Sequence, residues 1–490
     1  MEFSVNIQSQ TMNRDEGGKA VGHSIVAIVG GGFSGSMLAV ELLRRAAGSL
    51  SVVLIERGPV AGRGVAYGTQ FEGHLLNVRA ENMSAYANVP DHFVKWAQCH
   101  YNSSVKGDDF LPRPVYGRYV SSQLQEASDL YPAQFRCFQD EAISLAKIGD
   151  QAEIHLANGQ TVLADKVVLA LGNFPPADLR LPGKTANSSR YVSNPWSPKA
   201  LMGVSQEKSI LLIGSGLTSV DVTIELRARG FDGTIHILSR RGLLPQPDAA
   251  VPCRPFPIDN IPCTARGLLR TIRLQVEKAE ARGSNWREVV NSLRPVTQQI
   301  WRDLPRVEQM RFLRHLRTYW EVHRHRIAER IADQLTLQLR NGQIQMHAGR
   351  ITEYREDAGN VEITYRDRKC GELAKLHVDR VVNCTGPEGD CRRVASALLL
   401  DLVEKGLARP DQLSLGLDVS DDGALIDARG STSDFLYALG PLRKGNLWES
   451  IAVPEIRVQV AELADLLLAD YQQQSTETAR PSTTEMSASL

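Results

Sequence analysis

Apolar runs that end in a cluster of glycines, and that are followed by an amphipathic stretch, occur twice in the chain. Residues 24–46 read SIVAIVGGGFSGSMLAVELLRRA, and residues 209–230 read SILLIGSGLTSVDVTIELRARG. In each, the apolar run predicts a buried strand, the glycines a tight turn, and the periodic residues after them a helix. A further apolar run follows each helix, SVVLIERG in the first case and GTIHILSRRG in the second. We therefore expect two βαβ units with parallel strands.

Alternating segments and one more apolar strand follow each unit. AEIHLANGQTVLADKVVLALG contains Asn158-Gly159, and TLQLRNGQIQMHAGRITEYRE contains Asn341-Gly342. Asn-Gly between alternating segments favours a two-residue β-hairpin. Apolar strands then end at Gly172 and at Gly386, the latter within DRVVNCTG. The pattern predicts an α/β fold with two dinucleotide-binding (Rossmann-like) domains, each with a β-hairpin or meander insertion.

Residues 263–334 depart from this plan, because they are helical in pattern and rich in arginine. One helical stripe contains Phe312, Leu313, Leu316, Tyr319 and Trp320. The first interpretation is an α-helical insertion whose stripe packs on the second domain. The alternative is a lid that presents basic side chains to an anionic substrate, although basic helix faces are usually just solvated.

The expected domain boundaries follow from these patterns. They are a polar, disordered tail (1–23), the first nucleotide domain (24–200 and 396–471), the second nucleotide domain (205–262 and 335–395), the helical insertion (263–334) and a second disordered tail (472–490).

Composition excludes several classes of protein. The 490 residues are 42% hydrophobic and 23% charged with a formal net charge of zero, which is typical of a soluble protein and unlike a nucleic-acid-binding one. We find no apolar run long enough to span a membrane and no secretion signal near the start. The seven cysteines include no CxxC pair, which favours a reducing compartment. We expect a cytoplasmic enzyme without a metal, membrane or nucleic-acid partner.

The first glycine cluster matches the GxGxxG pattern of a dinucleotide site. Gly30 permits the tight turn, Gly32 lets backbone approach a pyrophosphate, and Gly35 allows close helix packing. The helix start, from Ser34, offers free N–H groups to phosphates. Glu56 ends the next strand, where a carboxylate accepts hydrogen bonds from an adenosine ribose. The loop after it contains Gly62 and Gly64, which permit backbone to approach a bound flavin.

The second cluster, Gly214, Gly216 and Ser219, reads GxGxxS. Its next strand ends in Ser239, Arg240 and Arg241, where an adenosine site usually has Asp or Glu. A carboxylate would repel a 2′-phosphate, whereas guanidinium groups bind it through charge-assisted hydrogen bonds. The first site is therefore expected to hold a resident FAD, and the second to bind NADPH, with NADH as the alternative. The candidate cofactor-binding residues of the two sites are Gly30, Gly32, Phe33, Ser34, Gly35, Glu56, Arg57, Gly62, Gly64, Gly214, Gly216, Ser219, Ser239, Arg240 and Arg241.

Residues 24–465 resemble the two-dinucleotide-binding flavoproteins, and in particular the flavin monooxygenases. VVLALGN and VVNCTGP resemble the linkers that join the two domains in that group. More narrowly, GVAYGT, HLLNVRAENMSAY, HFVKWA and ALGPLRKGNLWESIAVPEIR resemble a bacterial FAD/NAD(P)-binding family that includes an FAD-dependent urate hydroxylase and a nitrosuccinate synthase. The resemblance implies that Gly172, Gly386, Gly440 and Gly445 complete the cofactor sites. It also suggests weak candidates for substrate contact or catalysis in the glycine-rich loops, namely Arg63, Asn77, Arg79, Arg443 and Lys444.

Departures from related enzymes narrow the activity. No CxxxxC pair follows the first glycine helix, which excludes the disulfide reductases of this fold. RYVSNPWSP lacks the histidine of the Baeyer–Villiger fingerprint, and CTGP differs from the ATGY linker of ornithine and lysine N-hydroxylases, which weakens that assignment.

The resemblance implies an FAD-dependent, NAD(P)H-using monooxygenase that hydroxylates a small polar substrate with O₂ through a flavin C4a-hydroperoxide. Urate, giving 5-hydroxyisourate in purine catabolism, is the first substrate we expect. An amine or amino-acid N-monooxygenase and a flavin reductase that passes electrons to a partner protein stay open as alternatives.

Overall fold

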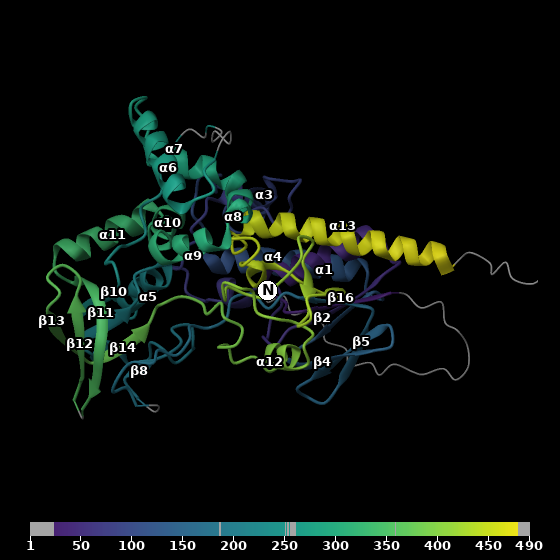
Figure 1. Cartoon of the computed structure of the whole chain (residues 1–490), viewed down its shortest axis with the longest axis horizontal. Helices are drawn as coiled ribbons and strands as arrows, with labels where there is room; N and C mark the ends of the chain where they lie inside the picture. The colour runs from purple at the N-terminus through teal and green to yellow at the C-terminus, as the bar shows by residue number, and fades with distance from the viewer. Residues whose placement is uncertain are drawn as a thin grey trace, which may run out of the picture.

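The computed structural model describes residues 24–478, apart from 186, 187, 250, 252, 253, 255–260 and 358. The expected tail 1–23 and residues 479–490 lie outside the described residues. Two large β-sheets form the centres of two lobes, and a group of helices joins them on one side (Figure 1). Within the described residues, no helix has the length and apolar character needed to cross a membrane.

The first lobe is built on a six-stranded sheet in the order β15-β16-β7-β1-β2-β3. Its strands are β1 (Ile25–Val29), β2 (Ser51–Ile55), β3 (Phe135–Phe138), β7 (Lys166–Leu169), β15 (Ala424–Ile426) and β16 (Thr432–Ala438). All neighbours run parallel except β15 and β16. Both faces of such a sheet are covered, so its central strands are apolar throughout.

Helix α1 lies at the centre of this lobe, packed between the sheet and two longer helices, α4 and α13. The helices of the lobe are α1 (Phe33–Ala46), α2 (Gly64–Tyr67), α3 (His92–His100), α4 (Arg113–Leu130), α12 (Ala397–Glu404) and α13 (Val453–Thr478). A small antiparallel sheet is formed by β4 (Ala142–Ile148), β5 (Gln151–Leu156) and β6 (Thr161–Ala164). The predicted hairpin at Asn158-Gly159 joins β5 to β6.

The second lobe contains a seven-stranded sheet in the order β13-β12-β11-β10-β9-β14-β8. Its elements are β8 (Tyr191–Val192), β9 (Ser209–Ile213), α5 (Leu217–Ala228), β10 (Thr234–Ser239), α11 (Glu329–Arg340), β11 (Ile344–Glu356), β12 (Val361–Asp367), β13 (Leu373–Val378) and β14 (Arg380–Asn383). The first part of β11 pairs parallel with β10, and its second part pairs antiparallel with β12. This strand therefore joins the βαβ unit to the predicted meander.

The hairpin predicted at Asn341-Gly342 is wrong. Residues before it form helix α11, and Gly342, with φ +72°, lies in the turn that leads into β11. Ile331 and Leu335 are buried and four residues apart, which is a helical spacing. Because a left-handed glycine also ends helices, Asn-Gly served here as a helix C-terminus.

The domain boundaries differ from the expectation in four places. β8 lies before residue 200, yet it pairs with β14 of the second sheet. Cys391 and Val394 lie before residue 396, yet they are buried in the core of the first lobe. α11 begins at Glu329, inside the expected insertion, and packs on the second sheet. α13 continues to Thr478, past the expected start of the tail, because the glutamines there are compatible with a helix.

The helical insertion contains α6 (Ala265–Glu280), α7 (Trp286–Leu293), α8 (Thr297–Asp303), α9 (Arg306–His315) and α10 (Arg317–Arg324). Apart from Tyr319, which contacts Arg241 of the second lobe, its apolar stripe does not pack on the second domain as the first interpretation required. Phe312, Leu313 and Trp320 instead join a cluster with Trp448 and Leu415 of the first lobe. The reason is that this part of the first lobe presents its own large apolar side chains to the helices.

Candidate functional site

The first glycine turn connects β1 to α1 with backbone that only glycine tolerates well. Gly30 has φ +102°, and a Cβ there would lie 2.4 Å from the carbonyl oxygen of Ala170. A Cβ on Gly35 would lie 1.9 Å from the carbonyl oxygen of Gly30, so α1 packs directly on the turn. The first turn of α1 has neither an acidic residue nor a side-chain cap. Its N-terminal N–H groups and positive dipole end suit a phosphate.

Glu56 follows β2 and faces this turn. Its carboxylate accepts hydrogen bonds from the backbone N–H of Gly31, at 2.5 Å, and of Gly58, at 2.6 Å. These bonds fix the side chain beside the glycine turn while leaving further lone pairs on both oxygens. Arg57 points away from the turn, because it is largely exposed and pairs with Glu141 at 3.6 Å.

Two other loops approach the start of α1. The backbone N–H of Gly62 donates to the carbonyl oxygen of Gly31 at 2.7 Å, and a Cβ on Gly32 would lie 3.6 Å from Cα of Gly64. A Cβ on Gly440 would lie 2.8 Å from Oγ of Ser34. Phe33 is buried against Tyr116. Glycines thus form a narrow cradle of backbone around the helix start, and this cradle fits the FAD that the sequence predicts.

The second glycine turn connects β9 to α5 in the same way. Gly214 has φ +111°, and a Cβ there would lie 2.3 Å from the carbonyl oxygen of Cys384. No described residue lies within 4 Å of a Cβ built on Gly216, so this turn is open toward the described part of the chain. Ser219 replaces the third glycine, and its buried hydroxyl has no hydrogen-bond partner within the described part of the chain.

Ser215, which the sequence analysis missed, holds the arginine-containing segment against the second turn. Its hydroxyl lies 2.6 Å from the carbonyl oxygen of Leu243 and 2.8 Å from Oγ of Ser239. Arg240 is exposed and makes no hydrogen bond or ion pair with any described residue. A serine inside GxG that can bridge to the following strand is the only signal that the sequence offered for this role.

A cleft of about 130 Å³ lies where the two interdomain linkers meet. Its lining comes from four segments and one helix of the insertion: Gly172, Asn173, Phe174, Pro387, Glu388, Gly389, Ser414, Leu415, Gly416, Pro441, Leu442, Lys444 and Arg317. Gly386 directly precedes the second linker segment and has φ +87°. The resemblance implies that Gly172, Gly386 and Gly440 complete the cofactor sites. Gly172 lines this cleft, as do Pro387 and Pro441, the residues that follow the other two glycines.

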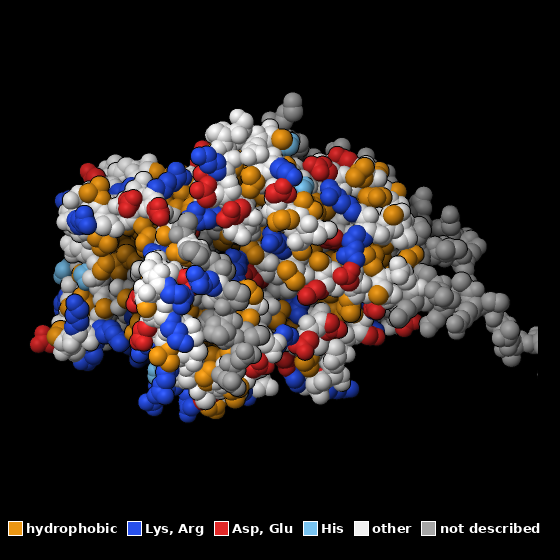
Figure 2. Space-filling model, turned by 90° about the horizontal axis from the view of Figure 1, so that it is seen from above, with side chains coloured by type: hydrophobic (Ala, Val, Ile, Leu, Met, Phe, Trp, Pro, Cys, Tyr) orange, Lys and Arg blue, Asp and Glu red, His pale blue; other side chains and the backbone are white. Residues whose placement is uncertain are grey.

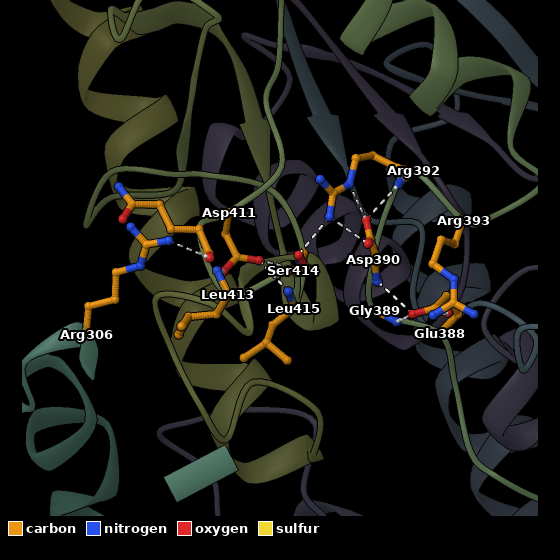
Figure 3. A network of polar contacts seen from close by, with 12 residues as sticks. Arg306, Glu388, Gly389, Asp390, Arg392, Arg393, Asp411, Leu413, Ser414 and Leu415 are labelled. Carbon is orange, nitrogen blue, oxygen red and sulfur yellow. Dashed lines mark hydrogen bonds and ion pairs between the residues drawn. The ribbon is translucent and has the colours of Figure 1, made fainter. Parts of the chain in front are cut away.

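Polar contacts hold two of the lining loops to each other (Figure 3). Asp411 accepts from the backbone N–H groups of Leu413 and Gly416, at 2.8 and 2.7 Å. Asp390 binds Arg392, whose guanidinium also donates to Oγ of Ser414 at 2.9 Å. Ser414 has φ +58°, an uncommon conformation for a residue with a side chain. The two loops are therefore held in one arrangement beside the cleft.

Two cations and one carboxylate line the cleft. Burial, followed by the nearby Arg317, lowers the pKa of Lys444 below its ordinary value. The Lys444 ammonium lies 4.9 Å from the centre of the Trp448 ring and forms no ion pair with any described carboxylate. Arg317 binds Glu321 at 2.7 Å. Glu388 is already neutralised, because it pairs with Arg393 at 3.3 Å and accepts from Gly389 N–H. The cleft therefore favours an anionic group.

Four other candidates for substrate contact lie elsewhere. Arg79 pairs with Asp248 at 2.9 Å and so joins the two lobes. Arg443 is buried, and its guanidinium donates to the carbonyl oxygen of Asp421 at 2.7 Å. Asn77 lines a second, smaller cavity between the lobes. Arg63 has a buried Nε without a hydrogen-bond partner. Among the described residues, Lys444 is therefore the one candidate for substrate contact that lines the cleft.

Gly445 lies behind the cleft, because a Cβ there would lie 2.5 Å from the carboxyl carbon of Asp411. Its carbonyl oxygen accepts from the indole N–H of Trp301 in the insertion, at 2.8 Å. Among the described residues, no group of three or more His, Cys, Asp or Glu side chains is arranged to hold a metal ion.

Comparisons with known proteins agree with this geometry. Residues 27–174 match a protein-family model described as FAD-NAD(P)-binding. An uncharacterised protein of Mycobacterium tuberculosis is 26% identical over 411 residues, which covers 75% of this chain and 74% of that protein.

Solved structures with the same fold include three enzymes. A reduced ornithine hydroxylase from Pseudomonas aeruginosa is 17% identical with a TM-score of 0.61, and the match covers 93% of this chain and 100% of that one. An ornithine N-hydroxylase from Kutzneria sp. 744, with reduced FAD, NADP⁺ and L-ornithine, is 14% identical with a TM-score of 0.62, and the match covers 92% of this chain and 99% of that one. The FAD-bound cadaverine monooxygenase from Erwinia amylovora is 13% identical with a TM-score of 0.61, and the match covers 95% of this chain and 99% of that one.

The fold is thus one that these FAD-dependent hydroxylases share. The match of residues 27–174 to an FAD-NAD(P)-binding family model confirms the prediction of FAD and a nicotinamide dinucleotide as cofactors. The CTGP linker weakened the assignment to the N-hydroxylases, yet ornithine hydroxylases share the architecture over more than 90% of this chain. A short linker sequence does not determine the packing of two domains.

Proposed function

We propose that this chain is an FAD-dependent, NADPH-using monooxygenase that oxidises the nitrogen of a small amine carrying a carboxylate, such as an amino acid. The observation that carries the proposal is the Lys444 ammonium on the cleft between the linkers, which pairs with no described carboxylate, beside Arg317, which is already paired with Glu321. The similarity in fold to ornithine and cadaverine hydroxylases supports an amine as the substrate. The cations support a carboxylate on it, because an uncompensated ammonium in a desolvated position is stabilised by an anion.

The chain's own residues bind and orient the substrate. FAD held at the first glycine turn would supply the redox chemistry, with NADPH as the two-electron donor and O₂ as the source of the transferred oxygen atom, the other oxygen leaving as water. Lys444 and Arg317 are placed to hold the substrate carboxylate at one side of the cleft. Phe174, Leu415 and Leu442 give the lining an apolar component, which reduces the water in contact with the reacting atoms.

Urate is less well supported than an amine. It is also an anion with hydrogen-bonding edges, so the cleft cations alone do not discriminate against it. The enzymes of like fold that bear on the choice are named for ornithine and cadaverine. The reductase alternative requires a docking site for a partner protein. Basic, acidic and hydrophobic side chains are intermixed on the face of the molecule that Figure 2 shows, so this face offers no surface of a single charge on which such a partner protein could dock.

The test uses FAD-loaded protein under air with NADPH. Consumption of NADPH, production of hydrogen peroxide and formation of a hydroxylamine are followed together with aspartate, ornithine, lysine, cadaverine and urate. An amino acid should stimulate NADPH consumption, form the N-oxidised product and yield little peroxide. Coupled loss of urate, or stimulation by cadaverine but by no amino acid, would contradict the proposal.

Replacement of the cleft lysine tests the role of the charge. Lys444→Met keeps the length of the side chain but removes the charge, and should raise KM for the amino acid roughly tenfold to a hundredfold, the value of one charge-assisted hydrogen bond. Lys95→Met removes an exposed lysine of α3 and should leave KM unchanged. An equal effect of both variants would argue against a carboxylate site at Lys444.

A further inference from the structure

Arg241, one of the two arginines predicted to bind the 2′-phosphate of NADPH, is held by the helical insertion. One of its terminal nitrogens donates to the Tyr319 hydroxyl at 3.1 Å, and the other to the carbonyl oxygen of His315, also at 3.1 Å. Its guanidinium carbon lies 4.8 Å from the centre of the Tyr319 ring. The contact joins the end of β10 to α9 and α10, which lie beside β10 and α5 in Figure 1.

These contacts hold the guanidinium without neutralising it. Arg241 forms no ion pair with a described Asp or Glu, whereas Arg326 pairs with Asp248 at 2.9 Å. A guanidinium has five N–H donors, so the two hydrogen bonds leave three for an anion. Both acceptors are neutral, and the ring face attracts the cation. The arrangement fixes the direction of a charge that still requires a counter-ion.

The position of Tyr319 is not explained by packing in the apolar core. Its side chain is 43% exposed, unlike Phe312, Leu313 and Trp320 of the same stripe, which join the apolar cluster. The hydrogen bond between Ser215 and Ser239 holds the base of the arginine segment to the glycine turn. Arg241 is therefore fixed from both sides, by the glycine turn below it and by the insertion.

We propose that Tyr319 is a positioning residue that orients Arg241 toward the 2′-phosphate, so that the helical insertion sets the preference of the second site for NADPH over NADH. Pre-orientation favours binding because less side-chain freedom is lost when the phosphate arrives. The proposal depends on NADPH binding at the second turn, and not on the identity of the oxidised substrate. The segment from His315 to Tyr319 also includes Arg317 of the cleft, so one part of the insertion reaches both sites.

The test measures binding to the FAD-loaded protein without any substrate, by calorimetry with 2′,5′-ADP and with 5′-AMP. Tyr319→Ala should weaken 2′,5′-ADP roughly fivefold to thirtyfold, because a hydrogen bond and a cation–π contact are lost. Tyr319→Phe keeps the ring and should lose only about twofold to fivefold. Binding of 5′-AMP should be unchanged in both variants. Tyr101→Ala is the matched control, since Tyr101 packs with Arg118 in the same manner on the first lobe.

A double variant separates positioning from direct contact. In an Arg241→Ala background, Tyr319→Ala should weaken 2′,5′-ADP no further, because there is no guanidinium left to orient. An additional loss in that background would mean that Tyr319 acts without Arg241 and would overturn the proposal. So would unchanged binding of 2′,5′-ADP to Tyr319→Ala, or an equal loss for 5′-AMP, which would indicate a purely structural role.

Discussion

The two glycine turns share a backbone and differ in what surrounds it. Gly30 and Gly214 have φ of +102° and +111°, and a Cβ on either would collide with a carbonyl oxygen of the neighbouring linker, at 2.4 and 2.3 Å. The first turn is enclosed by the loops of Gly64 and Gly440, whereas no described residue lies within 4 Å of a Cβ on Gly216. An enclosed turn suits a resident cofactor. An open one suits a nucleotide that binds and leaves in every catalytic cycle.

The strand that follows each turn ends in side chains of opposite charge. Glu56 is held by two backbone N–H groups at the first turn, and Arg240 and Arg241 stand at the second. The third position also differs, because Gly35 leaves no room for a side chain and Ser219 is accommodated. We propose that one backbone plan supports two ligands here, and that a few side chains at the strand ends discriminate between them.

The largest effect is expected from Gly214→Ala compared with Gly216→Ala. The first variant places a Cβ against the backbone of Cys384 at a positive φ, which should cost about 3 kcal/mol or more and unfold the second lobe at a lower temperature. The second variant adds a Cβ to extended backbone in open space and should retain the parent's thermal stability. Its NADPH affinity should fall, because the methyl group occupies the approach to the pyrophosphate.

Circular dichroism melts of the two variants, with FAD present, measure this difference. Similar melting temperatures for both would show that the strained position is not required by the fold. Unchanged NADPH binding by Gly216→Ala would show that the open turn is not the pyrophosphate site.

Local sequence patterns correctly predicted the structural features that depend only on residues close together in the sequence. Both glycine turns, the strands before them and the hairpin at Asn158-Gly159 follow from backbone preferences a few residues long. The pair Asn341-Gly342 was misassigned because the same dipeptide ends helices and hairpins. Propensity alone did not decide between them.

The composition of the cleft was not predictable in the same way. Arg317 and Lys444 are far apart in sequence, and they meet because the apolar side chains of the insertion pack on Trp448 of the first lobe. Arg79 and Arg443 had the expected residue type in the expected loops, yet their guanidinium groups are taken by Asp248 and by the Asp421 carbonyl. Such partners are set by tertiary packing, which no motif here encodes.

The charge difference between the turns is tested by Arg240→Ala. Loss of one charge-assisted hydrogen bond to the 2′-phosphate should weaken NADPH by roughly 1.5–3 kcal/mol, about tenfold to a hundredfold, and leave NADH nearly unchanged. Arg340→Ala, which removes an exposed arginine from the last turn of α11 in the same lobe, is the matched control. The measurement is the dissociation constant of each nucleotide. An equal loss of affinity for NADPH and NADH would show that Arg240 does not bind the 2′-phosphate.

The smallest expected effect is on the pH dependence of stability, and it arises from the sheets on which the two turns stand. In the second sheet, His236 and His347 lie on adjacent strands with Nδ1 and Nε2 3.1 Å apart, whereas the paired strands β2 and β3 of the first sheet contain no histidine. Burial, with a smaller contribution from His347, lowers the pKa of His236 to about 4, and burial lowers the pKa of His347. In the unfolded chain both titrate near 6.5, so below that pH the unfolded state binds more protons.

Stability from this pair is therefore complete above about pH 6.5 and is lost as the pH falls toward 4. Because both rings are partly exposed, we expect a loss of only about 1 kcal/mol. Thermal melts between pH 7.5 and 4.5 should show a shallower decline for His236→Gln than for the parent protein. His155→Gln, in the small sheet of the first lobe, should decline like the parent. If the melting temperature of His236→Gln falls as steeply with pH as that of the parent, the histidine pair does not make the second lobe more sensitive to acid than the first.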